Sequence, residues 1–144
     1  MSHDAPEGFQ PHTRHSPLTR PWEPIFVQTT ETAVILGLRL AEPHTNSRGF
    51  AHGGLIAAIA DNAMGLSCGL HFPGPNALVT INLTVDYLGT ARIGQWLAFE
   101  TVFVKATSSM AFASLIVTAD GEPCAKAGST FRNMAPKSNP TKPA

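Results

Sequence analysis

One long stretch of this chain is almost free of charge, and the exception within it is a single carboxylate. Asp61 is the only formally charged residue between Arg48 and Asp86, and it lies in the run HGGLIAAIADNAMGLSCGL, which is otherwise Gly, Ala, larger apolar residues and a few small polar ones. Burying a lone carboxylate is costly unless a partner stabilises it or unless it is there to react. Asp61 is therefore a candidate catalytic group. The alternative interpretation is an exposed helix acid or a buried cap whose hydrogen bonds are satisfied.

The same run predicts one long helix from His52 to about Leu70, opened by Gly53 and Gly54. Large apolar side chains recur near helical spacing at Leu55, Ile59, Leu66 and Leu70. The residues one and two turns from Asp61 on its own side are all small: Gly54, Ala57, Ala58, Gly65 and Cys68. This face of the helix can approach another surface closely, and it leaves room beside the carboxylate.

Strand-like segments lie on both sides of the predicted helix. One precedes it, at residues 32–41, and four follow it, at residues 77–88, 95–107, 109–119 and 123–134, with turn residues between them. One helix against an antiparallel sheet is an α+β architecture, and the Ala/Gly-rich helix favours a sheet wrapped tightly around it. Residues 1–20 predict a flexible N-terminal arm, residues 21–134 the folded domain, and residues 135–144 a disordered C-terminal tail.

The composition narrows the class of protein. A chain of 144 residues fits a single domain, and its charged fraction of 14% is low enough that we expect part of the surface to be buried in a homo-oligomer. No basic stripe favours nucleic acid as a partner, and no segment is apolar enough to span a membrane or act as a secretion signal. Cys68 and Cys124 form no motif typical of a zinc site or a disulfide framework. We expect a cytoplasmic protein without a metal or cofactor.

The motif NSRGFAHGG, which runs from Asn46 to Gly54, is followed by ADNA around Asp61, and together they resemble the motif of hotdog-fold acyl-CoA thioesterases. The most similar branch is the PaaI-like one, typified by phenylacetyl-CoA thioesterases. The segments VTINLTVDYL and AKAGSTFR also resemble that branch, so that the resemblance covers roughly residues 30–134. It implies a hotdog fold, with one long central helix wrapped by an antiparallel sheet. It also implies hydrolysis of a small aromatic or a short- to medium-chain acyl-CoA, in which CoA is part of the substrate.

Thioester hydrolysis needs an attacking water or carboxylate and donors for the developing oxyanion. The first turn of a helix offers free N–H groups and the positive end of the helix dipole. The resemblance implies that the Gly53 N–H polarises the thioester carbonyl and that Asp61 activates water or attacks directly. On one helix these two groups lie about 12 Å apart at 1.5 Å per residue. We therefore expect each site to combine Gly53 of one subunit with Asp61 of its neighbour.

The resemblance implies further roles, each with a plainer alternative. Asn46 matches a loop amide near the carbonyl or the water, although it could equally be a turn residue. His52 matches the motif histidine, here a positioning donor more than a base, or an ordinary residue at a helix start. Thr80 matches a hydroxyl that helps to hold the water, or it is a common strand threonine. We assign substrate binding to Gly54, Arg48, Lys105 and Ser108. The last two belong to a hairpin turn where many relatives carry basic residues.

Two other functions remain open on the same fold. One is a non-catalytic domain that binds an acyl ligand, and the other is a hydratase or dehydratase. A domain that only binds does not need a buried acid, whereas a hydratase needs a histidine beside Asp61 that only His52 of a neighbouring chain could supply. No dedicated acid for the leaving group is expected, because a thiol with a pKa of about 8.5 departs readily as thiolate.

Overall fold

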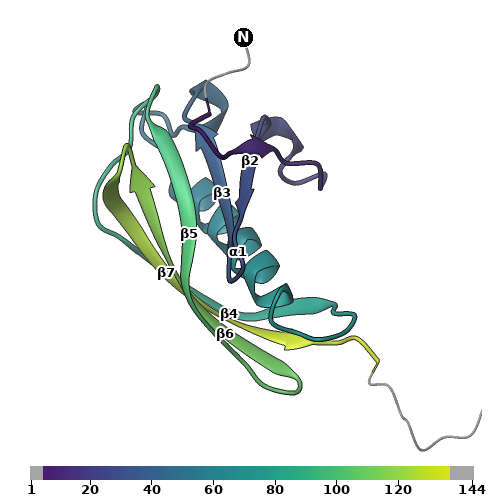
Figure 1. The fold of residues 1–144 in the computed structure, drawn as a ribbon. Coiled ribbons are helices and arrows are strands. Elements are labelled where there is room, and N and C mark those ends of the chain that lie inside the picture. Colours follow the sequence, from purple (N-terminus) through teal and green to yellow (C-terminus); the bar gives the residue numbers. More distant parts are fainter. Residues whose placement is uncertain (1–4, 137–144) are drawn as a thin grey trace, which may run out of the picture.

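The structure, a computed structural model, describes residues 5–136 of the chain. One helix, α1 (Gly53–Gly69), packs against a seven-stranded antiparallel sheet with the strand order β1-β2-β3-β5-β6-β7-β4 (Figure 1). The strands are β1 (Gln10–Pro11), β2 (Phe26–Thr29), β3 (Val34–Arg39), β4 (Leu78–Tyr87), β5 (Trp96–Ala106), β6 (Met110–Ala119) and β7 (Glu122–Asn133). Two short 3-10 turns complete the elements, η1 (Arg20–Trp22) and η2 (Glu42–His44).

The predicted helix and all five predicted strands are confirmed, and no boundary differs by more than two residues. The α+β architecture expected from the hotdog resemblance is also confirmed, because the sheet curves around the single helix (Figure 1). Sequence patterns missed β1 and β2, which are two and four residues long. Segments that short carry too few alternating positions to give a strand signal.

The helix is held by its apolar side, which packs into the concave face of the sheet. Buried residues of α1 include Leu55, Ile56, Ile59, Ala60, Ala63 and Met64. They share one core with Leu36, Leu38, Leu97, Phe99, Leu115 and Val117 of the central strands. Alanines along this side keep the helix close to the sheet, so that the curved sheet can wrap around it.

Part of the segment predicted to be a flexible arm contacts the domain, although most of its described residues are exposed. Gln10 and Pro11 pair with β2, and the His12 N–H donates to the Ile25 carbonyl at 2.8 Å. The Phe9 ring meets the Trp96 ring edge-on at 5.2 Å between centroids, and Thr19 is buried. Residues 1–4 lie outside the described residues, and so does the predicted tail beyond Pro136.

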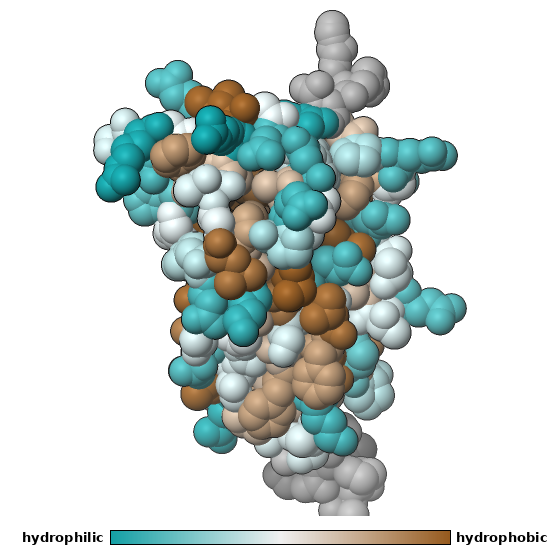
Figure 2. Space-filling view, turned by 90° about the vertical axis from the view of Figure 1, so that its left-hand side faces the viewer, coloured by the Kyte–Doolittle hydropathy of each residue, from teal (hydrophilic) through white to brown (hydrophobic). Residues whose placement is uncertain are grey.

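Strand β4 forms one edge of the sheet, because β7 is its single neighbour. Large apolar side chains on it are exposed, among them Val79 and Ile81, and further ones lie on the sheet at Val102, Phe103 and Phe112. Apolar surface also runs down the middle and lower part of the face shown in Figure 2. A long edge strand with apolar side chains is a ready template for pairing with another chain. Within residues 5–136, no helix is long and apolar enough to cross a membrane.

Candidate active site

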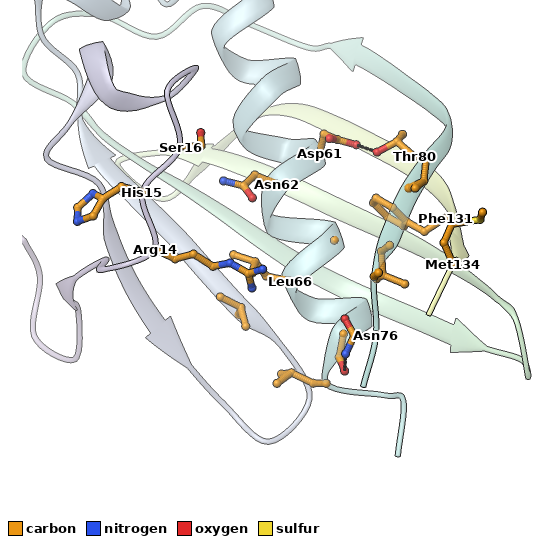
Figure 3. A pocket seen from close by; sticks show the side chains of 17 residues that line it. Arg14, His15, Ser16, Asp61, Asn62, Leu66, Asn76, Thr80, Phe131 and Met134 are labelled. Carbon is orange, nitrogen blue, oxygen red and sulfur yellow. Dashed lines mark hydrogen bonds between the residues drawn. The ribbon is translucent and has the colours of Figure 1, made fainter. Parts of the chain in front are cut away.

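Asp61 projects from α1 toward β4 and is oriented there by Thr80. The Thr80 Oγ1 donates to Asp61 Oδ1 at 2.7 Å (Figure 3). The pairing of β4 with β7 shifts register between Thr80 and Asn82, an irregularity of the kind that re-aims side chains next to active sites. No cationic side chain forms an ion pair with Asp61 in the described part of the chain, and its Oδ2 has no hydrogen-bond donor there. The carboxylate is therefore held in place by a neutral hydroxyl and keeps one oxygen free.

Asp61 and Thr80 line a cavity of about 740 Å³ that runs along the outer side of the helix. Its lining includes Asn62, Gly65, Leu66 and Gly69 of α1, Leu78 and Val79 of β4, and Phe131 and Met134 near the C-terminal end. Arg14, His15 and Ser16 of the N-terminal segment complete it (Figure 3). Of the small residues that the sequence predicted beside Asp61, Gly65 lines this cavity, whereas Gly54 lines a different one and Cys68 is buried in the core.

The start of α1 presents a second set of polar groups. His52 is the N-cap residue, with φ −70° and ψ 132°, and its Nδ1 accepts a hydrogen bond from the Gly54 N–H at 2.8 Å. In this contact the histidine is an acceptor, so the donor role expected from sequence falls to Nε2. The Gly53 N–H has no acceptor among the residues that the structure describes. It lies at the positive end of the helix dipole and is available to a ligand oxygen.

Asn46 closes the loop that leads into the helix. Its Oδ1 accepts hydrogen bonds from the backbone N–H groups of Arg48, at 2.9 Å, and Phe50, at 3.2 Å. The His52 N–H donates to the His44 carbonyl at 2.9 Å, which ties this loop to the start of α1. Asn46 therefore uses its side-chain oxygen to hold the turn of this loop. Its Nδ2 remains available for another partner.

The predicted substrate-binding residues are spread over different parts of the fold. Gly54 and His52 line a smaller cavity of about 300 Å³ together with Trp22, Pro43, Thr45 and Leu55. Arg48, Lys105 and Ser108 are exposed and line neither cavity. Sequence reasoning gave Arg14 and Trp22 no role in a site, although residues 22–27 have the pattern of a short amphipathic segment. It also gave no separate role to Tyr87, although this is the single tyrosine of the chain.

Two features define what this arrangement can do chemically. Burial raises the pKa of the Cys68 thiol to about 11 and also raises the pKa of Cys124, so both thiols stay protonated at neutral pH and are poor nucleophiles. No group of three or more potential metal ligands occurs in the part of the chain that the structure covers. A carboxylate with a free oxygen and a helix N–H without an acceptor are the reactive features, and they lie about 12 Å apart along one helix.

The sequence of this chain matches a known protein family. A sequence model described as the thioesterase superfamily matches residues 48–125, more than half of the chain. This chain belongs to the thioesterase superfamily. As a member of that superfamily it is a thioester hydrolase with a hotdog fold, which confirms the family expected from the sequence motif.

Individual relatives agree with this membership. A Pseudomonas aeruginosa protein described as an esterase is 40% identical over 112 residues, which cover 77% of this chain and 84% of that protein. Human acyl-coenzyme A thioesterase 13 is 32% identical over 96 residues, covering 65% of this chain and 66% of that protein. Both matches span most of the folded domain.

Solved structures show the same fold. The chain is similar to a Streptococcus mutans protein bound to acetyl CoA, with a TM-score of 0.73 and 24% identity over 87% of this chain and 100% of that chain. It is also similar to a mutant of the phenylacetic acid degradation protein PaaI from Thermus thermophilus, with a TM-score of 0.72 and 22% identity over 83% and 100%.

Proposed function

We propose that this thioesterase hydrolyses acyl-CoA, with Asp61 as the group that activates the attacking water or attacks directly. The observation that carries the proposal is the state of the Asp61 carboxylate. It lines a cavity of about 740 Å³, receives one hydrogen bond from Thr80 and has no cationic partner among the described residues. A carboxylate that served only a structural ion pair would have such a partner.

Hydrolysis by way of water proceeds in two steps. Asp61 accepts a proton from water as the water oxygen forms a bond to the carbonyl carbon, and the carbonyl oxygen takes the negative charge. The Gly53 N–H donates to that oxyanion. The tetrahedral intermediate then collapses, the carbon–sulfur bond breaks, and CoA leaves as a thiolate that takes up the proton held by Asp61, which returns Asp61 to the carboxylate. The products are the free acid and CoA.

In this proposal the site is shared between subunits of a homo-oligomer, which is at least a homodimer and, as a dimer of dimers, a homotetramer. Gly53 and Asp61 of one chain lie too far apart along α1 to reach one carbonyl, and the edge of β4 offers apolar residues and free backbone groups to a second copy. A two-fold arrangement would bring Gly53 of one subunit to Asp61 of the other and form two equivalent sites.

The acyl group is a small aromatic or a short- to medium-chain one. The cavity beside Asp61 and the smaller one beside His52 both have volumes in the range of small-ligand sites. Use of CoA as the carrier is supported by the name of the human relative and by the acetyl CoA in the similar structure. Arg48, Lys105 and Ser108 are the proposed contacts for its polar groups, with Gly54 and His52 beside the acyl group and Asn46 near the carbonyl.

A thiol-release assay against a panel of acyl-CoAs tests the reaction class. We expect release of free thiol with at least one short, medium or aromatic acyl group. The matching oxygen ester should be hydrolysed more slowly, because an alkoxide leaves far less readily than a thiolate. Binding of acyl-CoA without thiol release would instead support the non-catalytic domain. Addition or loss of water across an acyl double bond without thiol release would support the hydratase.

Mixing two inactive variants tests the shared site. Asp61→Asn removes the carboxylate, and Gly53→Pro removes the N–H. If each site combines the two chains, a mixed dimer contains one intact site and one site with both changes. Refolding or co-expressing equal amounts should restore about one quarter of wild-type activity, since about half of the dimers are mixed and half of their sites are intact. Each variant alone is the control. No recovery in a preparation shown by light scattering to contain mixed dimers would contradict the shared site.

A further inference from the structure

Tyr87 makes a contact with the helix start that the proposed mechanism does not use. It is the last residue of β4, and its hydroxyl donates to the Gly53 carbonyl at 2.6 Å. Its ring lies against the same residue, because a Cβ built on Gly53 would lie 3.2 Å from both Cζ and Oη of Tyr87. The glycine at position 53 and the tyrosine at position 87 therefore fit together, and a side chain at position 53 would push the ring away.

The peptide group between Gly53 and Gly54 is thereby held at both ends. Its carbonyl oxygen accepts from the Tyr87 hydroxyl, and its N–H donates to Nδ1 of His52 at 2.8 Å. Two consecutive glycines at a helix start have the greatest backbone freedom of any residue pair. Side chains that fix the plane of the peptide group joining them restrict this freedom, and with it the direction of the adjoining Gly53 N–H.

Strand β4 reaches both halves of the proposed catalytic machinery. It runs antiparallel to α1, so that Thr80 near its beginning meets Asp61 while Tyr87 at its end meets Gly53. The contact at Asp61 orients the carboxylate, and the contact at Gly53 acts on the backbone that carries the oxyanion donor. One strand thus supplies a hydrogen bond to each of the two proposed catalytic groups.

We propose that Tyr87 is a positioning residue, which holds the first turn of α1 so that the Gly53 N–H points at the carbonyl oxygen of the thioester. This inference rests on the proposed function, because it gives the Gly53 N–H the role of oxyanion donor. Donors that are oriented before the reaction stabilise the transition state without reorganising during it. Loss of the Tyr87 hydroxyl should therefore slow the chemical step more than it weakens substrate binding.

Tyr87→Phe is the variant that tests this role, because it keeps the ring against Gly53 and removes only the hydroxyl. We expect kcat to fall about three- to tenfold, the range that corresponds to the net free energy of one neutral hydrogen bond, while KM stays within about twofold. The thermal unfolding midpoint should change little, since the tyrosine side chain is half exposed. Hydrogen exchange of the Gly54 amide should become faster, which is a readout independent of activity.

Thr84→Val is the matched control. It also removes a hydroxyl from β4, where Thr84 Oγ1 donates to Asn82 Oδ1 at 3.3 Å and makes no hydrogen bond to α1 among the described residues. We expect its kcat, KM and Gly54 exchange to equal those of the wild type. Equal kcat in Tyr87→Phe and wild type would overturn the proposal, as would a rise in KM with unchanged kcat, which would make Tyr87 a substrate contact.

The proposed function and the role of Tyr87 fail in different ways. If the wild type released no thiol from any acyl-CoA, or if Asp61→Asn kept full turnover, the proposed function would be wrong. A change of Gly54 exchange in Tyr87→Phe would then still show that the hydroxyl restrains the helix start. Conversely, an active enzyme whose Tyr87→Phe variant keeps both kcat and Gly54 exchange would leave the function intact and refute the positioning role.

Discussion

Asp61→Asn is expected to lower the rate of thioester hydrolysis by about 10²–10⁴, the scale of losing a general base. The amide has the size of the carboxylate, and its oxygen can still accept the hydrogen bond that Thr80 now donates to Asp61 at 2.7 Å. It cannot take up the proton of the attacking water. KM should change little, and the thermal unfolding midpoint should hold or rise, because a charge without a cationic partner is removed.

Single-turnover hydrolysis and thermal unfolding of the same preparation decide this prediction. Asp86→Asn is a matched control, since it removes an exposed carboxylate of β4 whose nearest cation, Lys126, is 3.9 Å away. We expect that control to keep turnover within about twofold of the wild type, as is usual for an exposed ion pair of little energetic weight. A stable Asp61→Asn variant with near-normal turnover would mean that Asp61 is not the catalytic group. A destabilised variant with normal activity per folded molecule would make it a structural cap.

Gly53→Pro is expected to lower kcat by about 10²–10³, the loss seen when one oxyanion donor is removed. The backbone suits the change, because proline is favoured as the first residue of a helix and His52 before it is extended, with ψ 132°. The Gly53 N–H has no acceptor among the described residues, so its removal breaks no hydrogen bond of the fold. The variant therefore removes the proposed donor, and its added Cβ crowds the Tyr87 ring as any side chain at position 53 would.

Gly53→Ala is the control for the added side chain. Its Cβ meets the Tyr87 ring at the same 3.2 Å, while the N–H is retained. We expect the alanine variant to lose less than about tenfold in kcat, which would attribute the remainder of the proline effect to the N–H. Steady-state kinetics with thermal unfolding of both variants measure the difference. Equal losses in the two variants would attribute the effect to crowding against Tyr87 and remove the oxyanion role of Gly53.

The sequence by itself determined the elements and the main candidate residue. The helix and the five longer strands follow from apolar spacing and turn residues, which are properties of neighbouring positions and are therefore legible in one segment at a time. Asp61 stood out as a candidate catalytic group because it is the only formally charged residue between Arg48 and Asp86. The motif around His52 and Gly53 indicated the family, which the family match over residues 48–125 confirms.

Only the tertiary structure decided which distant residues meet. Thr80 reaches Asp61, and Tyr87 reaches Gly53, because β4 lies along the helix in one register and direction, which no local pattern encodes. The N-terminal segment shows the same limit. Its short strand and the contact of Phe9 with Trp96 depend on a surface that exists only after β2, β3 and β5 have paired. Contacts of this kind arise only after the strands have paired into the sheet, so the sequence of one segment taken alone does not predict them.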